Sequence, residues 1–185
     1  MGSIGSDAAI AATADAHDDR AFRGEVLREA VTMVLYVSVV EIAELAALPE
    51  EHFSDGHVTG PVGAQLLAII WGTAVGLAIA HWFAFRLAAP AFRGDRVTRH
   101  DTIIGIAQVG AAMFVALISS VPVVLLSDVR AQEMTGDVPA VVIGVVGYAI
   151  ARSTGRSRAA AVFYGLTALA LGVLVALVKT KLAAH

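Results

Sequence analysis

Long runs of uncharged, mostly apolar residues are the feature that most constrains this chain. A helix needs about 20 such residues to cross the hydrocarbon core of a bilayer. Three uncharged runs reach that length: residues 62–85, 102–127 and 159–178. Because the lipid interior offers no partner for backbone N–H and C=O groups, segments that cross it fold as helices. The sequence therefore predicts an all-α, polytopic integral membrane helical bundle.

Residues 30–48 and 138–151 are weaker candidates, since the first run contains two glutamates and the second is short. The arginines decide whether these runs cross, because cytoplasmic loops carry most of the Lys and Arg residues. Arginine is concentrated in residues 20–28, 86–99 and 152–158. The other two connecting segments, residues 49–61 and 128–137, carry only one arginine, Arg130, and no lysine. This alternation requires both weak runs to cross, so we expect about five spans with a cytoplasmic N-terminus. Lys179 and Lys181 depart from this rule, because five spans place them on the outer side of the membrane.

The remaining segments complete the expected organisation. Residues 1–24 are acidic and rich in small side chains, and they lack the charged-then-apolar order of a signal peptide, so they predict a mobile N-terminal tail. Residues 25–181 form the membrane domain and residues 182–185 a C-terminal tail. Arginine outnumbers lysine, and Ala, Val and Gly abound, as in proteins of GC-rich bacteria. We therefore expect a multi-pass protein of the bacterial cytoplasmic (inner) membrane.

Composition and motifs exclude several classes of function. The chain has no cysteine, so it has no disulfide and no thiolate zinc site. A formal net charge of −3 argues against a nucleic-acid partner. Gly-x-Ser-x-Gly, His-Glu-x-x-His, phosphate-loop and dinucleotide motifs are absent from the sequence. We expect neither an enzyme nor a bound cofactor.

Glu41 and Glu44 lie in an otherwise apolar run and, three residues apart, share one helix face. An ionised carboxylate near the bilayer centre costs a few kcal/mol, so it must be paired, hydrated or protonated. The sequence places no basic residue at that depth, and the expected partners are neutral: Thr73, Ser119, Ser120 and Thr167, with Gln65 further out. At least one glutamate should then hold a proton or share a cation. The alternative is a structural hydrogen bond between helices, or a position of Glu44 at the outer interface.

These residues predict a small transporter or channel for protons or cations that works as a homo-oligomer in the lipid bilayer. The expected ion pathway comprises Glu41, Glu44, His81, Gln108, Ser119, Ser120 and Thr73. His81 and Gln108 would form its inner exit, although His81 at a helix end also suits a position among the headgroups. The alternative function is a non-transporting membrane scaffold or accessory subunit, which binds a partner through a small-residue helix face or the basic loop at residues 93–100.

The segment after the first span is acidic and has no basic side chain other than histidine. Its polar residues are Glu50, Glu51, His52, Asp55 and His57. On the outer side of the membrane this loop would attract cations toward Glu44. A solvated polar loop is the plainer interpretation. A divalent metal such as Zn²⁺ or Mn²⁺ is a third, although the spacing matches no specific metal motif.

Small residues recur every fourth position through residues 64–88, and Gly72, Gly76 and Ala80 lie at the centre of this ridge. Such a ridge lets another helix approach closely. We expect it to pack within one protomer, with a homodimer seam as the alternative. Glycine pairs in the later spans, at residues 144 and 147 and at 165 and 172, predict further close contacts.

Overall fold

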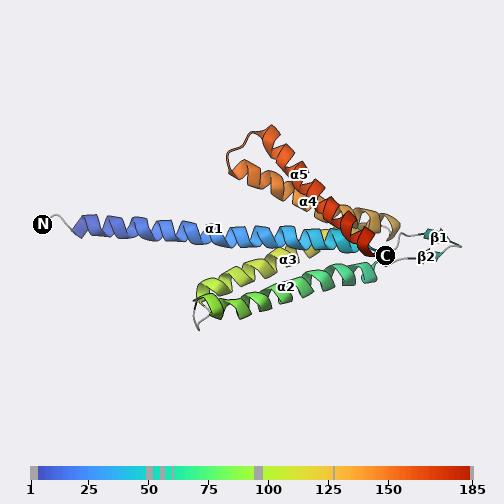
Figure 1. The fold of residues 1–185 in the computed structure, drawn as a ribbon, viewed down its shortest axis with the longest axis horizontal. Helices are drawn as coiled ribbons and strands as arrows, with labels where there is room; N and C mark the ends of the chain where they lie inside the picture. Colours follow the sequence, from blue (N-terminus) through green and yellow to red (C-terminus); the bar gives the residue numbers. More distant parts are fainter. Residues whose placement is uncertain are drawn as a thin grey trace.

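The computed structural model describes residues 4–48, 52–54, 57–59, 61–93, 98–126 and 128–183 (Figure 1). It contains five helices and one short hairpin in the following order: α1 (Ile4–Leu45), β1 (His52–Ser54), β2 (His57–Thr59), α2 (Ala64–Arg93), α3 (Arg99–Leu125), α4 (Asp128–Ser153) and α5 (Arg158–Ala183). The strands pair antiparallel, with Phe53 opposite Val58. This hairpin, in the loop after the first helix, was not expected from the sequence.

Four of the described helices are long and apolar enough to cross a membrane. Their apolar spans are Ala64–Leu87, Arg99–Leu125, Met134–Ser153 and Arg158–Val175. Large apolar side chains, including Phe83, Ile106 and Phe163, are exposed on the outside of the bundle. A helix that is apolar on its outer surface as well as its inner one suits lipid better than water. The architecture is that of a helical membrane bundle, as the sequence predicts.

The apolar part of α1 is the fifth predicted span, and it is not among these four. Helix α1 ends at Leu45, so a stretch of it that is long enough to cross includes Arg28 and Glu29 as well as the two glutamates. It nevertheless occupies the middle of the bundle. Helix α1 contacts each of the other four helices and lies between the α2–α3 pair and the α4–α5 pair (Figure 1). Neighbouring helices therefore surround the segment that carries both glutamates.

Two boundaries differ from those predicted. The apolar part of α4 extends over Met134–Ser153, so the fourth span is not short by length. The sequence prediction stopped at the acidic Asp137, but the helix continues through it with that side chain exposed. Residues 4–24, predicted to be a mobile tail, belong to α1, which projects beyond the other helices here (Figure 1). This segment is rich in alanine and has no proline, and alanine is the best helix former.

The core between α1, α2 and α3 is built from one face of each helix. In α2 the buried residues recur every fourth position: Leu66, Ile70, Ala74 and Ala78. They pack with Met33 and Val37 of α1 and with Val115 of α3. A second cluster joins Ile42 and Ala43 of α1 to Ile143 of α4. These two clusters hold α1 between the helix pairs.

The small-residue ridge of α2 does not pack within the protomer, which corrects the first interpretation of the sequence. Its members Gly72, Gly76 and Ala80 are exposed, and a methyl group added at either glycine would meet no atom within 4 Å. The ridge is offset by two residues from the buried one, and two residues turn a helix by about 200°. The two ridges therefore lie on opposite faces of α2. A seam between two copies stays a prediction.

The later glycines do make close contacts, and they join α4 to α5. A Cβ added at Gly165 would lie 2.7 Å from the carbonyl oxygen of Gly144, and one added at Gly147 would lie 3.2 Å from Cα of Gly165. At Gly172 an added Cβ would lie 2.9 Å from Cδ1 of Ile143. The absence of side chains here allows the two backbones to approach, as the sequence predicts.

Candidate functional site

Glu41 lies where α1 meets α3, in the interior of the bundle. Its side chain is only 1% exposed. The hydroxyl of Ser119, which is 0% exposed, donates a hydrogen bond of 2.7 Å to Oε2 of Glu41. Within the described part of the chain, Glu41 forms no ion pair. The carboxyl group is thus removed from solvent, with one neutral protein partner.

Glu44, one turn further along the helix, is directed toward α2 and is half-buried. Its Oε2 accepts a hydrogen bond from the hydroxyl of Thr73. Glu41 and Glu44 therefore connect α1 to two different helices. The contacts with Ser119 and Thr73 bring together the glutamates and two of the polar residues that the sequence proposed as their neighbours.

Ser120 lies next to Ser119 but takes part in a different contact. Its hydroxyl donates to the carbonyl oxygen of Ala116 at 2.7 Å and accepts a hydrogen bond from Nε1 of Trp71 at 3.0 Å. The side chain of Ser120 therefore joins α3 to α2. The structure does not bring it to the Glu41 carboxyl group.

Two buried oxygen atoms of α1 have no hydrogen-bond partner among the described residues. They are Oε1 of Glu41 and Oγ of Ser38, which is 0% exposed. The two residues are three positions apart, so their side chains share a helix face. A buried polar atom without a partner costs about 1–3 kcal/mol, and more when it is charged. Besides Oε1 of Gln108, these two are the buried side-chain oxygens that have no partner among the described residues.

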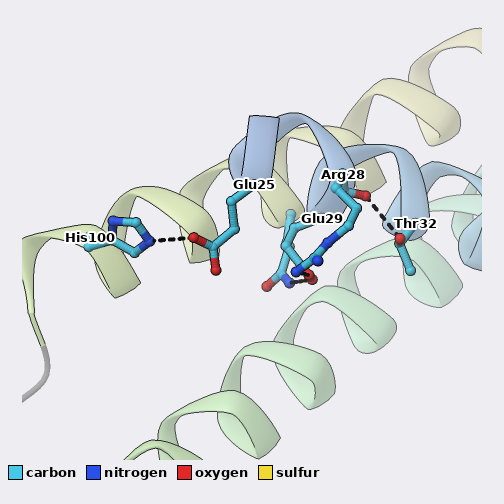
Figure 2. A network of polar contacts seen from close by, with 6 residues as sticks. Glu25, Arg28, Glu29, Thr32 and His100 are labelled. Carbon is cyan, nitrogen blue, oxygen red and sulfur yellow. Dashed lines mark hydrogen bonds and ion pairs between the residues drawn. The ribbon is translucent and has the colours of Figure 1, made fainter. Parts of the chain in front are cut away.

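A second group of polar contacts lies between α1 and the beginning of α3. Helix α3 begins in a capping box, in which the backbone N–H of Asp101 donates to Thr98 Oγ1 and the backbone N–H of Thr98 donates to Asp101 Oδ2. This start positions His100, whose Nε2 lies 2.9 Å from Oε2 of Glu25, as Figure 2 shows. The ring of Phe22 lies 4.3 Å from that of His100 between centroids.

Glu29 and Gln108 continue this group toward the bundle interior. Nε2 of Gln108 donates to Oε2 of Glu29 at 3.1 Å, and Arg28 donates to the other carboxylate oxygen at the same distance (Figure 2). Gln108 is buried, and its Oε1 has no partner among the described residues. His81, expected beside Gln108 at an inner exit, is half-buried on α2, and the hydrogen bond of Gln108 does not go to it. Glu29 is the partner of Gln108 instead.

An apolar layer separates the two polar groups. Glu29 and Glu41 are twelve residues apart, which is about 18 Å along a helix. Between them, Met33 and Val37 of α1 pack against the core residues of α3, and both are buried. In the conformation described, therefore, no polar side chain of this α1 ridge links Glu29 to Glu41.

Sequence reasoning missed Glu25 and Glu29, and it placed Ser38 on the helix face of Glu41 and Glu44 without including it in the expected pathway. A usable signal was present. Glu25, Glu29, Met33, Val37 and Glu41 recur every fourth residue. Such a row winds around the helix by about 40° at each step, so a helix that crosses α1 at an angle can follow the row from Glu41 to Glu29 and Glu25. The prediction began the first span at residue 30 and did not extend the row to the residues before it.

The acidic loop cannot be joined to this site. Glu50, Glu51 and Asp55 lie outside the described residues. His52 and His57 belong to β1 and β2, of which the structure gives the backbone pairing. Among the described residues there is no group of three His, Asp or Glu side chains that could hold a metal ion. Attraction of cations by this loop stays a prediction.

The contact between Glu41 and Ser119 makes a prediction about stability. Ser119→Ala should lower the free energy of unfolding by about 1–3 kcal/mol, because it leaves a buried carboxyl oxygen without its donor. When Glu41→Met is added, the double variant should recover most of this loss, since both polar partners have become apolar. The free energy of unfolding in mixed detergent micelles is measured for Ser119→Ala, for Glu41→Met and for the double variant. Additive effects, within about 0.5 kcal/mol, would show that the two side chains are not coupled.

Comparison of the chain with protein-family models, with curated proteins and with solved structures finds no match.

Proposed function

We propose that this chain is a small membrane transporter or channel for protons or cations, with Glu41 as its central site. One observation carries the proposal: the carboxyl group of Glu41 is buried among apolar helices, and one of its oxygens has no hydrogen-bond partner in the part of the chain that the structure describes. An acidic group at such depth needs a positive species or water, and intramembrane acids are typical of ion and proton pathways.

Glu44 is the second site of the proposed pathway. It lies one turn from Glu41 and nearer the C-terminal end of α1, where the acidic loop follows in the sequence. It is also less buried than Glu41. An ion attracted by the loop would meet Glu44 first and Glu41 next. Thr73 and Ser119 hold the two carboxyl groups in place.

The group formed by Glu25, Glu29, His100 and Gln108 is the opposite end of the pathway, in place of His81. The apolar layer at Met33 and Val37 closes the route between this end and Glu41. Passage then requires a second conformation in which α1 and α3 separate at this layer. A barrier that opens only in a second conformation is what distinguishes a transporter or a gated channel from an open pore. Pro122, which removes one backbone hydrogen bond from α3, is a suitable place for such a movement.

Reconstitution of the purified full-length protein into liposomes tests the proposal. A proton, Na⁺ or K⁺ gradient is imposed across the vesicles that contain the protein. These vesicles should dissipate at least one of the three gradients about tenfold faster than protein-free vesicles. A tenfold difference in rate corresponds to about 1.4 kcal/mol in the barrier to ion passage. A pH-sensitive dye and ion-selective electrodes measure the rates. If no gradient is dissipated, transport is wrong, and the membrane scaffold is the remaining function.

The proposed working form is a homo-oligomer in a bacterial inner membrane, with the N-terminus in the cytoplasm. The exposed ridge at Gly72, Gly76 and Ala80 supports this proposal, because its small residues allow a second helix to approach closely. The arginine distribution supports the orientation. Gly72→Leu should then weaken self-association without unfolding the protomer, which chemical cross-linking in membranes would detect.

A further inference from the structure

The surroundings of Glu41 contain more oxygen atoms than hydrogen-bond donors. Ser119 gives its one hydroxyl proton to Oε2 of Glu41. Oε1 of Glu41 and Oγ of Ser38 receive nothing from the described residues. All three side chains are at most 1% exposed. Four oxygen atoms from α1 and α3 are therefore buried at this place, and a single hydrogen bond connects two of them.

Pro122 frees a further oxygen beside Ser119. Proline has no N–H, so the carbonyl group of Ile118, four residues earlier, lacks its usual donor in the helix. Pro122 is buried, as are Ser119 and Val115. These three positions are separated by three and four residues, so they lie on one face of α3. A helical carbonyl group is directed toward the residue four positions later, so the Ile118 carbonyl oxygen is directed toward Pro122, on the face that carries the Ser119 hydroxyl.

We propose that Glu41 Oε1, Ser38 Oγ, Ser119 Oγ and the Ile118 carbonyl oxygen bind a monovalent alkali-metal cation. This inference rests on the proposed function for its role in transport and specifies which species occupies the central site. Backbone carbonyls freed in interrupted membrane helices, together with side-chain oxygens, are suitable ligands for such cations.

The charge and the type of ligand select the ion. One carboxylate neutralises one positive charge, whereas a divalent ion would leave an unpaired charge in the interior. Hydroxyl, carboxylate and carbonyl oxygens suit hard cations rather than zinc or copper, which prefer imidazole and thiolate. A proton on Oε1 of Glu41 could be donated to Ser38 Oγ in a single hydrogen bond, but it would leave the Ile118 carbonyl oxygen unused. An alkali cation contacts the oxygens of both α1 residues at once.

Thermal unfolding of the purified full-length protein tests this site without a transport assay. The unfolding temperature in NaCl, LiCl and KCl is compared with that in choline chloride at the same ionic strength. Binding to the folded state should raise it by about 3–6 °C when one alkali ion saturates the site. Ser38→Ala and Glu41→Gln should each abolish most of this shift. Ser120→Ala is the matched control, because its hydroxyl contacts Trp71, and it should keep the shift.

The possible results separate the two proposals. An unfolding temperature that is equal in all four salts overturns the cation site, and so does a shift that survives both Ser38→Ala and Glu41→Gln. If Glu41→Gln does not fold, Ser38→Ala alone decides. A proton flux without any effect of alkali ions leaves the proposed function intact and removes this inference. An alkali-dependent shift in a protein that dissipates no gradient has the opposite meaning: the site exists, and transport is wrong.

Discussion

The rate of gradient dissipation, after the leak of protein-free vesicles is subtracted, is expected to be about 100-fold lower in liposomes that contain the Glu41→Gln variant than in those with the unchanged protein. Glutamine has nearly the same shape as glutamate, and its amide can still accept the hydrogen bond of Ser119. It carries no charge, however, and a cation at the centre of a membrane without a counter-charge costs about 2.5–3.5 kcal/mol or more. A factor of 100 corresponds to about 2.7 kcal/mol.

Two controls show whether this loss belongs to Glu41 itself. Glu44→Gln should slow the flux less, because Glu44 is half-buried and nearer the end of α1. Ser120→Ala should leave the flux within about twofold of the unchanged protein, a difference of less than 0.5 kcal/mol. Each variant is reconstituted only after size-exclusion chromatography shows the same elution as the unchanged protein. A Glu41→Gln protein that is folded and fully active would remove Glu41 from the pathway.

Replacing Gly165 by leucine should have the largest effect on stability. An added Cβ would lie 2.7 Å from the carbonyl oxygen of Gly144 and 3.3 Å from the backbone nitrogen of Tyr148. These neighbours are backbone atoms, so they cannot move aside by rotation of a side chain, and α4 and α5 would have to separate. Overpacking costs about 1–3 kcal/mol in ordinary cores, and we expect a loss at or above the upper end.

Gly72→Ala is the matched control for this effect. Gly72 is also a glycine within a membrane helix, but a methyl group added there would meet no atom within 4 Å. Alanine is favoured over glycine in a helix by about 1 kcal/mol, so this variant should be as stable as the unchanged protein or slightly more stable. Denaturation in mixed micelles compares the two variants. Equal stability of the Gly165→Leu and Gly72→Ala proteins would contradict the close packing of α4 and α5.

Glycine positions illustrate how far sequence reasoning reaches in this protein. The four-residue recurrence of small side chains in α2 and the glycine pairs in α4 and α5 both indicate a close helix contact. The pattern does not indicate which helix makes this contact, because a helix has several faces and the sequence does not say which face a neighbouring helix covers. In α2 the buried face carries Leu66 and Ile70, and Gly72 points away from it. In α4 and α5 the glycines do form the contact.

The candidate site, too, could be predicted from the sequence only in part. That Glu41 lies deep in an apolar run, with no basic residue nearby, follows from the sequence, because the lipid sets the length of a span and so the depth of each position. The depth also suggested Ser119 and Thr73 as neighbours. It did not distinguish Ser119 from Ser120, which differ by about 100° around the helix axis. It also missed Glu25 and Glu29, since their place in the bundle depends on how far α3 extends alongside α1.

The amino-acid sequence alone determined that this is a helical membrane bundle and that its first apolar segment carries two acids. The reason is that the requirement for backbone hydrogen bonds in lipid leaves few alternatives to a helix. Tertiary structure decided that α1 lies in the middle of the bundle, that Ser119 and Thr73 bond to the two glutamates, and that Ser38 and Oε1 of Glu41 have no partner among the described residues. These features depend on the order in which the helices pack side by side, and that order is set by the fit of side chains from distant parts of the chain.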